Sequence, residues 1–541
     1  MKRSSILTAT LVAILTGALS LALVGTAAAQ TPKRGGKLVY IVPASGLPSM
    51  DAHRETTYAV IHPVAPFYSL MIRIDPTDPK GQRIEGDAAE SWVISPDKKT
   101  YTFKIRRNIR FHDGTALKAR DVVATYKKII FPAKGVLSAR VGYFKMVESV
   151  KNPDDSTVVF KLKFASPALL PALAMPYNFI YSADILAKDM HWFEKNVMGS
   201  GPFKNAKFTP GSNMIGERND DYFKPGLPYL DSIEAIFTKK QSIQVTAIRG
   251  RRAMVNFRAF PPATVDDIVR GLGKENVTVQ ESTWNCALFV TPNSHRKPFD
   301  DPRVRRAINL AIDRWGGSQY LSRIAIVKTV GGLVFPGHPL AMTDSELEQN
   351  LEGFGRDMKA NRAKARQLLK EAGQEGLKFT FHNRAVEQPY KIVGTWLIDQ
   401  WRRVGMNVDQ WVQPTAQFYK TLRSNPPGYD VSMDFNCQAI VNPTLDMSKF
   451  LSWDAGGGSN NGKYIDREID KLFDQQLREP DQAKQKQILV AYQKRIINEK
   501  AFYFPTLWWN RIVPHNAKLK GWNITASHYL NQQLEVVWLD Q

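Results

Sequence analysis

Residues 86–130 constrain the fold of this chain more than any other stretch, because the hydrophobic period changes within them. The first part alternates apolar and polar side chains, as a half-buried strand does, and its apolar members are Tyr101, Phe103 and Ile105. Turn sequences lie on both sides of this strand, at residues 95–97 and 113–114. After the second turn the apolar spacing becomes that of a helix, at Ala119, Val122, Val123 and Tyr126. The stretch therefore predicts a pair of strands followed by an amphipathic helix.

The N-terminus predicts a secretory signal peptide over residues 1–29. Lys2 and Arg3 precede an apolar run from 6 to 24, and the small residues before Gln30 fit a cleavage site. An uncleaved membrane anchor is the alternative, but threonine and serine within the run favour cleavage. Because residue 30 is not cysteine, the mature N-terminus offers no thiol for a lipid. We expect a free protein in the periplasm.

The chain has 541 residues, too many for a single hydrophobic core, so two or three domains are expected. Such a chain can bury a ligand between its domains. Its composition is that of a globular protein, with 43% hydrophobic residues. Helical periods at residues 302–312, 362–372, 391–404, 466–478 and 481–498 alternate with predicted strands at 156–164, 233–237 and 406–412. This alternation indicates an α/β fold.

The net charge is unusually positive, at +22 for the whole chain and +20 without Lys2 and Arg3. Such a charge can draw a protein toward anionic surfaces or speed the capture of anionic ligands. Nucleic acid is not an expected partner, because the charges are scattered and no zinc-finger, basic-zipper or RNA-binding signature is present. A solvated basic surface is the favoured interpretation.

Several ordered motifs resemble the peptide/nickel family of extracytoplasmic solute-binding proteins, which feed ABC importers. They are the strand, FHDG turn and helix of residues 86–130, GSGPFKNAKFTPGSNMIGERNDDYF (199–223), KPFDDPRVRRAINLAIDR (297–314), KYIDREIDKLFDQ (463–475) and AFYFPTL (501–507). The resemblance implies a two-lobed periplasmic binding protein with an additional β-rich domain and a ligand cleft between the lobes. It places lobe I at 30–74, 195–285 and 504–541, the extra domain at 75–194, and lobe II at 286–503.

Two cysteines, Cys286 and Cys437, lie 151 positions apart. An exported protein folds where disulfides persist, but spacing alone leaves a bridge and two free thiols equally open. The oligopeptide binders of the family join cysteines at corresponding places, so the resemblance favours a bridge here. It also implies that an aspartate two residues after the second cysteine holds a peptide's amine. This chain has Ala439 there, which argues against recognition of a free amine.

The resemblance supplies the remaining candidate ligand-binding residues. They are the neighbours of Ala439 and four aromatic residues at places where family members pack ligand side chains: Asn436, Gln438, Asn442, Trp284, Phe289, Trp508 and Trp509. A core position is the alternative for each aromatic residue. A second departure is the basic loop at residues 249–252, where the family carries acidic residues; it faces either the cleft or, as we favour, solvent.

No enzyme signature is found. The chain has no G-x-S-x-G, H-E-x-x-H or C-x-x-C, and its nine histidines are scattered singly. We therefore expect no catalytic residue, no metal site and no cofactor. The expected function is that of a periplasmic receptor, a monomer that captures a short peptide or a polar solute of similar size. Its expected partners are the permease and ATPase of an ABC importer at the inner membrane. A non-peptide or nickel-chelate ligand is the alternative, and an exported enzyme is a more distant one.

Overall fold

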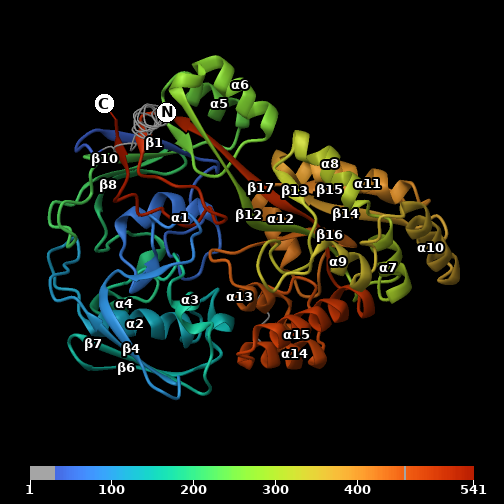
Figure 1. Cartoon of the computed structure of the whole chain (residues 1–541), viewed down its shortest axis with the longest axis horizontal. Coiled ribbons are helices and arrows are strands. Elements are labelled where there is room, and N and C mark those ends of the chain that lie inside the picture. Colours follow the sequence, from blue (N-terminus) through green and yellow to red (C-terminus); the bar gives the residue numbers. More distant parts are fainter. Residues whose placement is uncertain (1–30, 456–458, 541) are drawn as a thin grey trace, which may run out of the picture.

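The computed structural model describes residues 31–455 and 459–540. The predicted signal peptide, at 1–29, lies outside these residues. One mixed sheet runs through most of the molecule (Figure 1). Its strands, in spatial order, are β15 (Asn407–Gln413), β14 (Lys378–Arg384), β16 (Val431–Cys437), β12 (Val277–Pro292), β17 (Phe504–Asn516), β11 (Val255–Asn256), β1 (Lys37–Val42), β10 (Ser232–Phe237), β9 (Asn213–Arg218) and β8 (Phe203–Thr209), with β13 (Val327–Thr329) beside β17.

Two long antiparallel strands, β12 and β17, join the two halves of this sheet. Their register runs from Val277 opposite Asn516 to Val290 opposite Phe504. On one side β17 pairs with β11, and on the other β12 pairs with β16. In Figure 1 the two strands cross diagonally from one half of the molecule to the other. The register shifts between Trp284 and Ala287, so the pair is irregular where it passes between the halves.

We call the two halves the first and second lobes. The first lobe contains β1 and β8 to β11 with helices α1 (Tyr58–Val64), α5 (Gln241–Arg249) and α6 (Pro262–Leu272). The second lobe contains β14 to β16 with helices α7 (Pro302–Leu310), α8 (Arg314–Ile324), α9 (Asp344–Asn350), α10 (Met358–Glu371), α11 (Ile392–Arg402), α12 (Thr415–Leu422), α13 (Pro443–Met447), α14 (Arg467–Arg478) and α15 (Gln482–Lys494).

A separate antiparallel sheet forms the outer domain. Its strand order is β4 (Ala89–Ile94), β5 (Thr100–Ile105), β7 (Thr157–Leu162) and β6 (Val147–Asp154), and helices α2 (Ala119–Ile130), α3 (Leu169–Leu173) and α4 (Ala183–Lys188) accompany it. Short ladders elsewhere pair β2 (Ile72–Ile74) with β3 (Ile84–Gly86), and β18 (Leu519–Lys520) with β19 (Trp538–Leu539). The outer domain falls within the range 75–194 predicted for the extra domain; the domain boundaries themselves stay a prediction.

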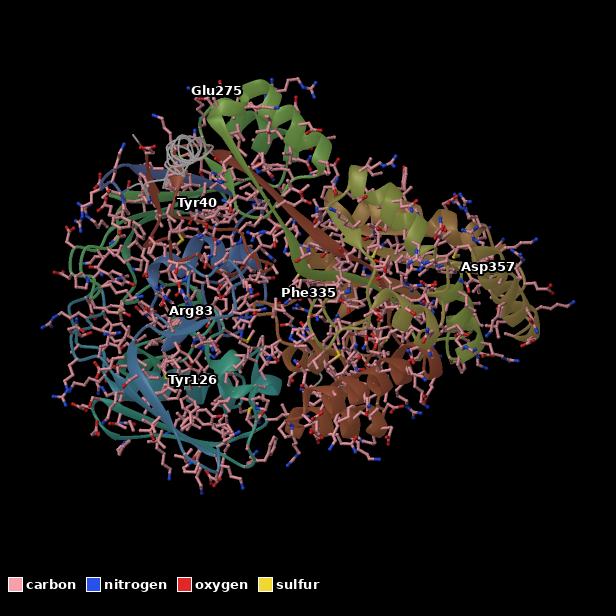
Figure 2. The ribbon with its side chains drawn as sticks, viewed as in Figure 1. Tyr40, Arg83, Tyr126, Glu275, Phe335 and Asp357 are labelled. Carbon is pink, nitrogen blue, oxygen red and sulfur yellow. A yellow bond between two sulfur atoms is a disulfide. The ribbon has the colours of Figure 1, made fainter. Side chains whose placement is uncertain are left out.

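The strand and helix predicted at residues 86–130 are confirmed. In β5 the side chains of Tyr101, Phe103 and Ile105 are buried and alternate with more exposed ones. In α2 the apolar face predicted from Ala119 to Tyr126 is buried. The ring of Tyr126, labelled in Figure 2, packs edge-on against Phe160 of β7 at 5.1 Å between centroids. The change of hydrophobic period therefore marks the place where a helix covers the sheet.

Helix ends follow the predicted capping chemistry. The side chain of Asp301 accepts a hydrogen bond from the Arg303 amide ahead of α7, and Pro302 takes the first helical position. After α11, Gly405 has φ +89°, a conformation that glycine adopts without strain. The largest difference at a helix start is that of α10, which begins four residues before the predicted 362, because Asp357 caps it by accepting from the Ala360 amide. Asp357 lies at the far edge of the second lobe in Figure 2.

No helix in the described part of the chain has the length and apolar character required to cross a membrane.

Candidate ligand-binding cleft

Two adjoining cavities open where the lobes face each other. The smaller chamber, about 520 Å³, lies between the outer domain and the second lobe. The larger chamber, about 1350 Å³, lies between the first and second lobes. The walls of both chambers share Arg54, Glu55, Thr56, Tyr419, Arg423, Phe435 and Cys437. The two chambers thus form one cleft of a size that suits a small ligand.

The charged groups of the smaller chamber are held by the protein itself. Lys449 and Asp434 are almost fully buried and form an ion pair, with Nζ 2.8 Å from Oδ2. Asn461 also donates to Asp434 Oδ2 at 2.9 Å, and Lys449 donates to the Ser459 carbonyl at 3.0 Å. Every charge of this pair therefore has a partner within the chain.

Arg140 contributes a second buried charge to the wall of the smaller chamber. Its guanidinium donates to the carbonyl oxygens of Ala52, His53 and Glu55 and stacks 3.9 Å from the ring centroid of Tyr177. These bonds tie the outer domain to the segment that leads into α1. Arg140 therefore fixes the wall of the cleft.

Glu55 is the acidic group in the wall common to both chambers. Burial raises the pKa of its carboxyl above the ordinary value, while Arg54, Arg423 and Arg140 act in the opposite direction and Asp51 adds to the rise. Its carboxylate lies 3.4 Å from Arg54 Nε. A carboxyl group with a raised pKa thus lies beside Arg54 at the junction of the chambers.

Three predicted residues, Asn436, Gln438 and Ala439, line the smaller chamber. Gln438 donates from Nε2 to Asn436 Oδ1 at 3.2 Å and accepts from the Tyr143 hydroxyl at 3.3 Å. Ala439 brings no charge to this wall, and the nearby Asp434 is held by Lys449. The smaller chamber therefore presents amide groups where a peptide ammonium would require a carboxylate.

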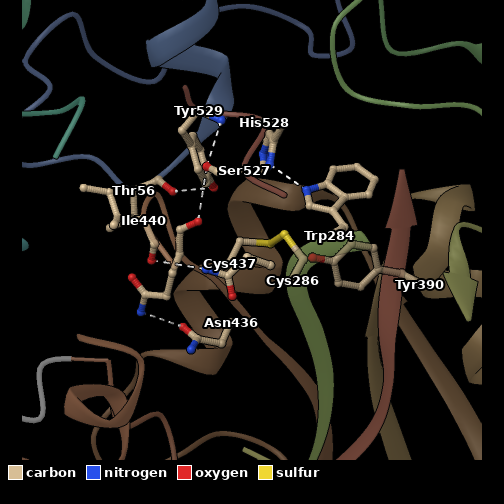
Figure 3. Close-up of a disulfide and its surroundings, with 12 residues drawn as sticks. Thr56, Trp284, Cys286, Tyr390, Asn436, Cys437, Ile440, Ser527, His528 and Tyr529 are labelled. Carbon is tan, nitrogen blue, oxygen red and sulfur yellow. Dashed lines mark hydrogen bonds between the residues drawn. A yellow bond between two sulfur atoms is a disulfide. The ribbon is translucent and has the colours of Figure 1, made fainter. Parts of the chain in front are cut away.

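Cys286 and Cys437 are bonded to each other (Figure 3). They stand directly opposite in the β12–β16 ladder, with Cα atoms 4.1 Å apart. Cys437 lines both chambers. The disulfide thus fastens the strand that carries Asn436 and Gln438 to a strand that crosses between the lobes.

Aromatic rings and cations line the larger chamber. The aromatic residues are Tyr58, Tyr390, Tyr419, Phe435, Trp509 and Tyr529, and the cations are Arg54, Lys239, Lys240, Arg258, Arg384, Lys391 and Arg423. Its acidic residues are Glu55, Asp267 and Glu387. Of these, Asp267 is paired with Arg249, whose Nη1 lies 3.4 Å away, and Glu55 lies beside Arg54. The larger chamber therefore carries a net positive charge.

Trp509 is the one predicted aromatic residue that lines a chamber; Trp284, Phe289 and Trp508 do not. Trp284 donates from Nε1 to His528 Nδ1 at 2.8 Å, as Figure 3 shows, and Trp508 donates to the Gly332 carbonyl at 3.0 Å. Phe289 packs edge-on against Phe450 and Tyr503. Neighbouring strand residues point to opposite faces, so Trp509 faces the cleft and Trp508 faces the core behind it.

Asn442 also lies outside the chamber walls. Its side chain accepts a hydrogen bond from the Leu445 amide at 3.3 Å and caps α13. This is the ordinary role of asparagine ahead of a helix. Asn442, Trp284, Phe289 and Trp508 thus lie outside the walls of both chambers and contact other parts of the protein, and their contact with a ligand stays a prediction.

Most residues of the cleft were not identified from the sequence. They include Arg54, Glu55, Arg140, Tyr143, Tyr177, Arg258, Arg384, Tyr390, Tyr419 and Arg423. These residues come from segments hundreds of positions apart, and no local spacing relates them. The basic loop at 249–252 does not line the cleft: it is exposed to solvent, as favoured. No group of three or more potential metal-ligating side chains was found within residues 31–455 and 459–540.

Comparisons with known proteins agree with this architecture. A di/tripeptide-binding protein from Pseudomonas aeruginosa is 24% identical over 75% of this chain and 78% of its own length. The periplasmic protein DppA from Helicobacter pylori, solved with the peptide STSA, superposes with a TM-score of 0.80 at 23% identity, covering 94% of this chain and 99% of that one. AgaA from A. tumefacien R10, solved with agropinic acid, gives a TM-score of 0.80 at 20% identity, with coverage of 94% and 99%.

These likenesses establish the fold as that of a two-lobed periplasmic binding protein. The family described as "Bacterial extracellular solute-binding proteins, family 5 Middle" matches residues 83–461, which is more than half of the chain. The chain belongs to the family 5 bacterial extracellular solute-binding proteins.

Proposed function

We propose that this protein captures a short peptide, or a polar solute of similar size, and delivers it to the permease and ATPase of an ABC importer. The observation that carries this proposal is the cleft itself, two adjoining chambers enclosed by both lobes and lined by polar and aromatic groups. Such a lining offers hydrogen bonds for affinity and shaped apolar surface for selectivity. Family membership and relatives named as peptide-binding proteins support the transport role.

In this proposal the lobes close on the ligand about the two crossing strands. The irregular pairing of β12 with β17 near Trp284 offers a place for the bend. Ligand contacts to both lobes would favour the closed form by their difference in binding free energy between open and closed states. The permease would then distinguish closed from open receptor.

The same proposal places the protein in the periplasm, after removal of residues 1–29, as a monomer that binds and releases its solute unchanged. Exported family relatives support this location. A receptor that diffuses between solute and permease requires no anchor and no chemistry at its cleft.

A non-peptide ligand in the same transport role is the second candidate. Ala439 favours it, since both carboxylates that line the smaller chamber within the described residues have cationic neighbours: Asp434 is paired with Lys449, and Glu55 lies beside Arg54. The structural relative AgaA, solved with agropinic acid, shows that this fold also houses a compound that is not a peptide. A nickel chelate belongs to this second candidate.

Native mass spectrometry of the protein taken from a periplasmic extract tests both candidates. A co-purified series of free peptides would support the peptide proposal, and a single non-peptide or metal-containing mass would replace it by the second. Turnover of the released compound by pure protein would contradict the receptor role. Titration of tryptophan fluorescence with the recovered compound would then report its binding, since Trp509 lines the larger chamber.

A further inference from the structure

Arg258 is an unusual residue in the wall of the larger chamber. It lies between β11 and α6, and only 9% of it is exposed. Within the described part of the chain its side chain makes no hydrogen bond or ion pair, and its Nε is buried without an acceptor. A buried N–H group without an acceptor destabilises a folded protein, because it has lost water and gained no hydrogen bond in return, and the Nε of Arg258 is such a group.

Aromatic rings surround this guanidinium. Its central carbon lies 4.7 Å from the ring centroid of Tyr58, 5.3 Å from that of Trp509 and 5.6 Å from that of Trp284. Ring faces stabilise a cation electrostatically and hold the guanidinium plane in place. They do not accept hydrogen bonds at its edge, so the N–H groups remain available to a ligand in the chamber.

The other buried arginines of this protein show what Arg258 lacks. Arg140, Arg314 and Arg511 each donate to three or more oxygen atoms of the chain. Arg73 forms ion pairs with Glu85 and Glu535. The fold therefore supplies acceptors to arginines whose role is structural. Arg258 differs from them because its side chain has no such acceptor within the described residues.

The surroundings add positive potential to this site. Exposed Lys239, Lys240, Lys391 and Arg423 line the same chamber, and the guanidinium of Arg384 packs over the rings of Tyr390 and Tyr419. The acids of the chamber are fewer, and two of them are beside arginines. A cavity walled by low-dielectric protein and lined by one sign of charge concentrates ligands of the opposite sign.

We propose that the solute is an anion and that Arg258 binds its oxyanion group, a carboxylate or a phosphate, in the larger chamber. A guanidinium edge matches two oxygen atoms of such a group. The inference rests on the proposed function and narrows its ligand class to acidic or amine-blocked compounds. It gives the larger chamber the main part in recognition and leaves the smaller chamber to neutral groups of the ligand.

The test uses the whole mature protein and four alanine dipeptide derivatives: free, N-acetylated, C-amidated and blocked at both ends. Isothermal titration compares wild type with R258Q. The N-acetylated anion is expected to bind wild type most tightly and to lose about tenfold or more in affinity in R258Q, as the loss of a charge-assisted hydrogen bond predicts. The doubly blocked compound is expected to bind both proteins equally. Inorganic phosphate, tested in parallel, separates a phosphate-specific site from a carboxylate site.

R251Q is the matched control, since Arg251 is exposed outside the cleft and the change in net charge is the same. R258K keeps the charge without the planar fork and should retain part of the affinity, so it serves if R258Q does not fold. Equal binding of N-acetyl-Ala-Ala to wild type and R258Q would overturn the inference, as would the absence of Arg258-dependent binding by every anionic probe at millimolar concentration. A free peptide that binds both proteins alike leaves the transport proposal standing and removes this one. If anions bind at Arg258 but no importer requires the protein for uptake, this inference stands and the transport proposal fails.

Discussion

The two chambers of the cleft differ in whether their buried charged side chains have partners within the chain. In the smaller chamber Asp434 and Lys449 form an ion pair, and Arg140 donates from both terminal nitrogens to three backbone carbonyls, although its Nε has no acceptor. In the larger chamber Arg258 is buried among aromatic rings without an acceptor. Buried charges with partners hold the fold together, whereas a buried charge without one lowers stability and is best explained by a ligand. The buried charges of the smaller chamber thus stabilise the fold, whereas Arg258 of the larger chamber is placed to bind a ligand.

The largest effect is expected from the disulfide, which fastens the wall shared by both chambers. Removing it in C286S/C437S should lower the free energy of unfolding by about 4 to 5 kcal/mol, because the bridge closes a loop of 151 positions in the unfolded chain. Urea unfolding of oxidised wild type and of the double variant measures this. Loss of stability without a change at either chamber would show that the bridge supports the fold alone; weakened ligand binding would show that it also positions β16.

The same substitution in the two chambers tests the comparison directly. K449M leaves Asp434 buried without its cation and should cost about 3 to 5 kcal/mol. R258M removes a buried cation that has no hydrogen-bond acceptor and should change stability by less than about 1 kcal/mol, since lost cation–π attraction and relieved desolvation oppose each other. Thermal and urea unfolding of both variants provide the measurement. Equal costs would remove the distinction between the chambers.

Placing a carboxylate at position 439 of the smaller chamber should shift ligand preference toward peptides with a free amine. A439D is expected to raise the affinity for free Ala-Ala relative to N-acetyl-Ala-Ala by about tenfold, because an ammonium in a closed cleft gains a charged partner. Titration calorimetry with both compounds measures the ratio, and A439N controls for size. A ratio unchanged in A439D would mean that ligand amines do not reach this wall.

The smallest effect concerns Glu55, between the chambers. Since burial raises the pKa of Glu55, its negative charge is lost early as the pH falls, and an anion should then bind more tightly. We expect affinity for N-acetyl-Ala-Ala to rise about threefold between about pH 7 and pH 5, where the ligand carboxylate stays ionised. E55Q should show the higher affinity throughout and no such dependence. A fall in affinity over this range in wild type would contradict the sign of the argument.

Much of the fold follows from local sequence. The alternation at Tyr101, Phe103 and Ile105 identifies β5, and Asp301 with Pro302 identifies the start of α7. Side-chain period and capping are properties of a few consecutive residues, so they can be interpreted without knowledge of distant contacts. Errors arise at boundaries such as that of α10, where a cap one turn earlier extends the helix.

The cleft follows from local sequence only in part. Asn436, Gln438 and Ala439 were found because they adjoin a cysteine recognisable by its place in the family, and Trp509 because it falls where family members pack ligand side chains. Nothing in the sequence separates Trp509 from Trp508, since their roles depend on which face of β17 borders the cleft. Arg258 gives no signal in the sequence either, because its neighbours Tyr58 and Trp509 come from the two ends of the chain.

The sequence by itself determined the α/β class, several strands and helices with their caps, and the family through its ordered motifs. Tertiary structure alone decided which side chains face the cleft, which charges are neutralised and which cation is left for a ligand. The physical reason is the distance along the chain over which each interaction acts. Periodicity and capping act within a few residues, whereas the partners of a buried charge are set by the packing of segments that meet only in the folded protein.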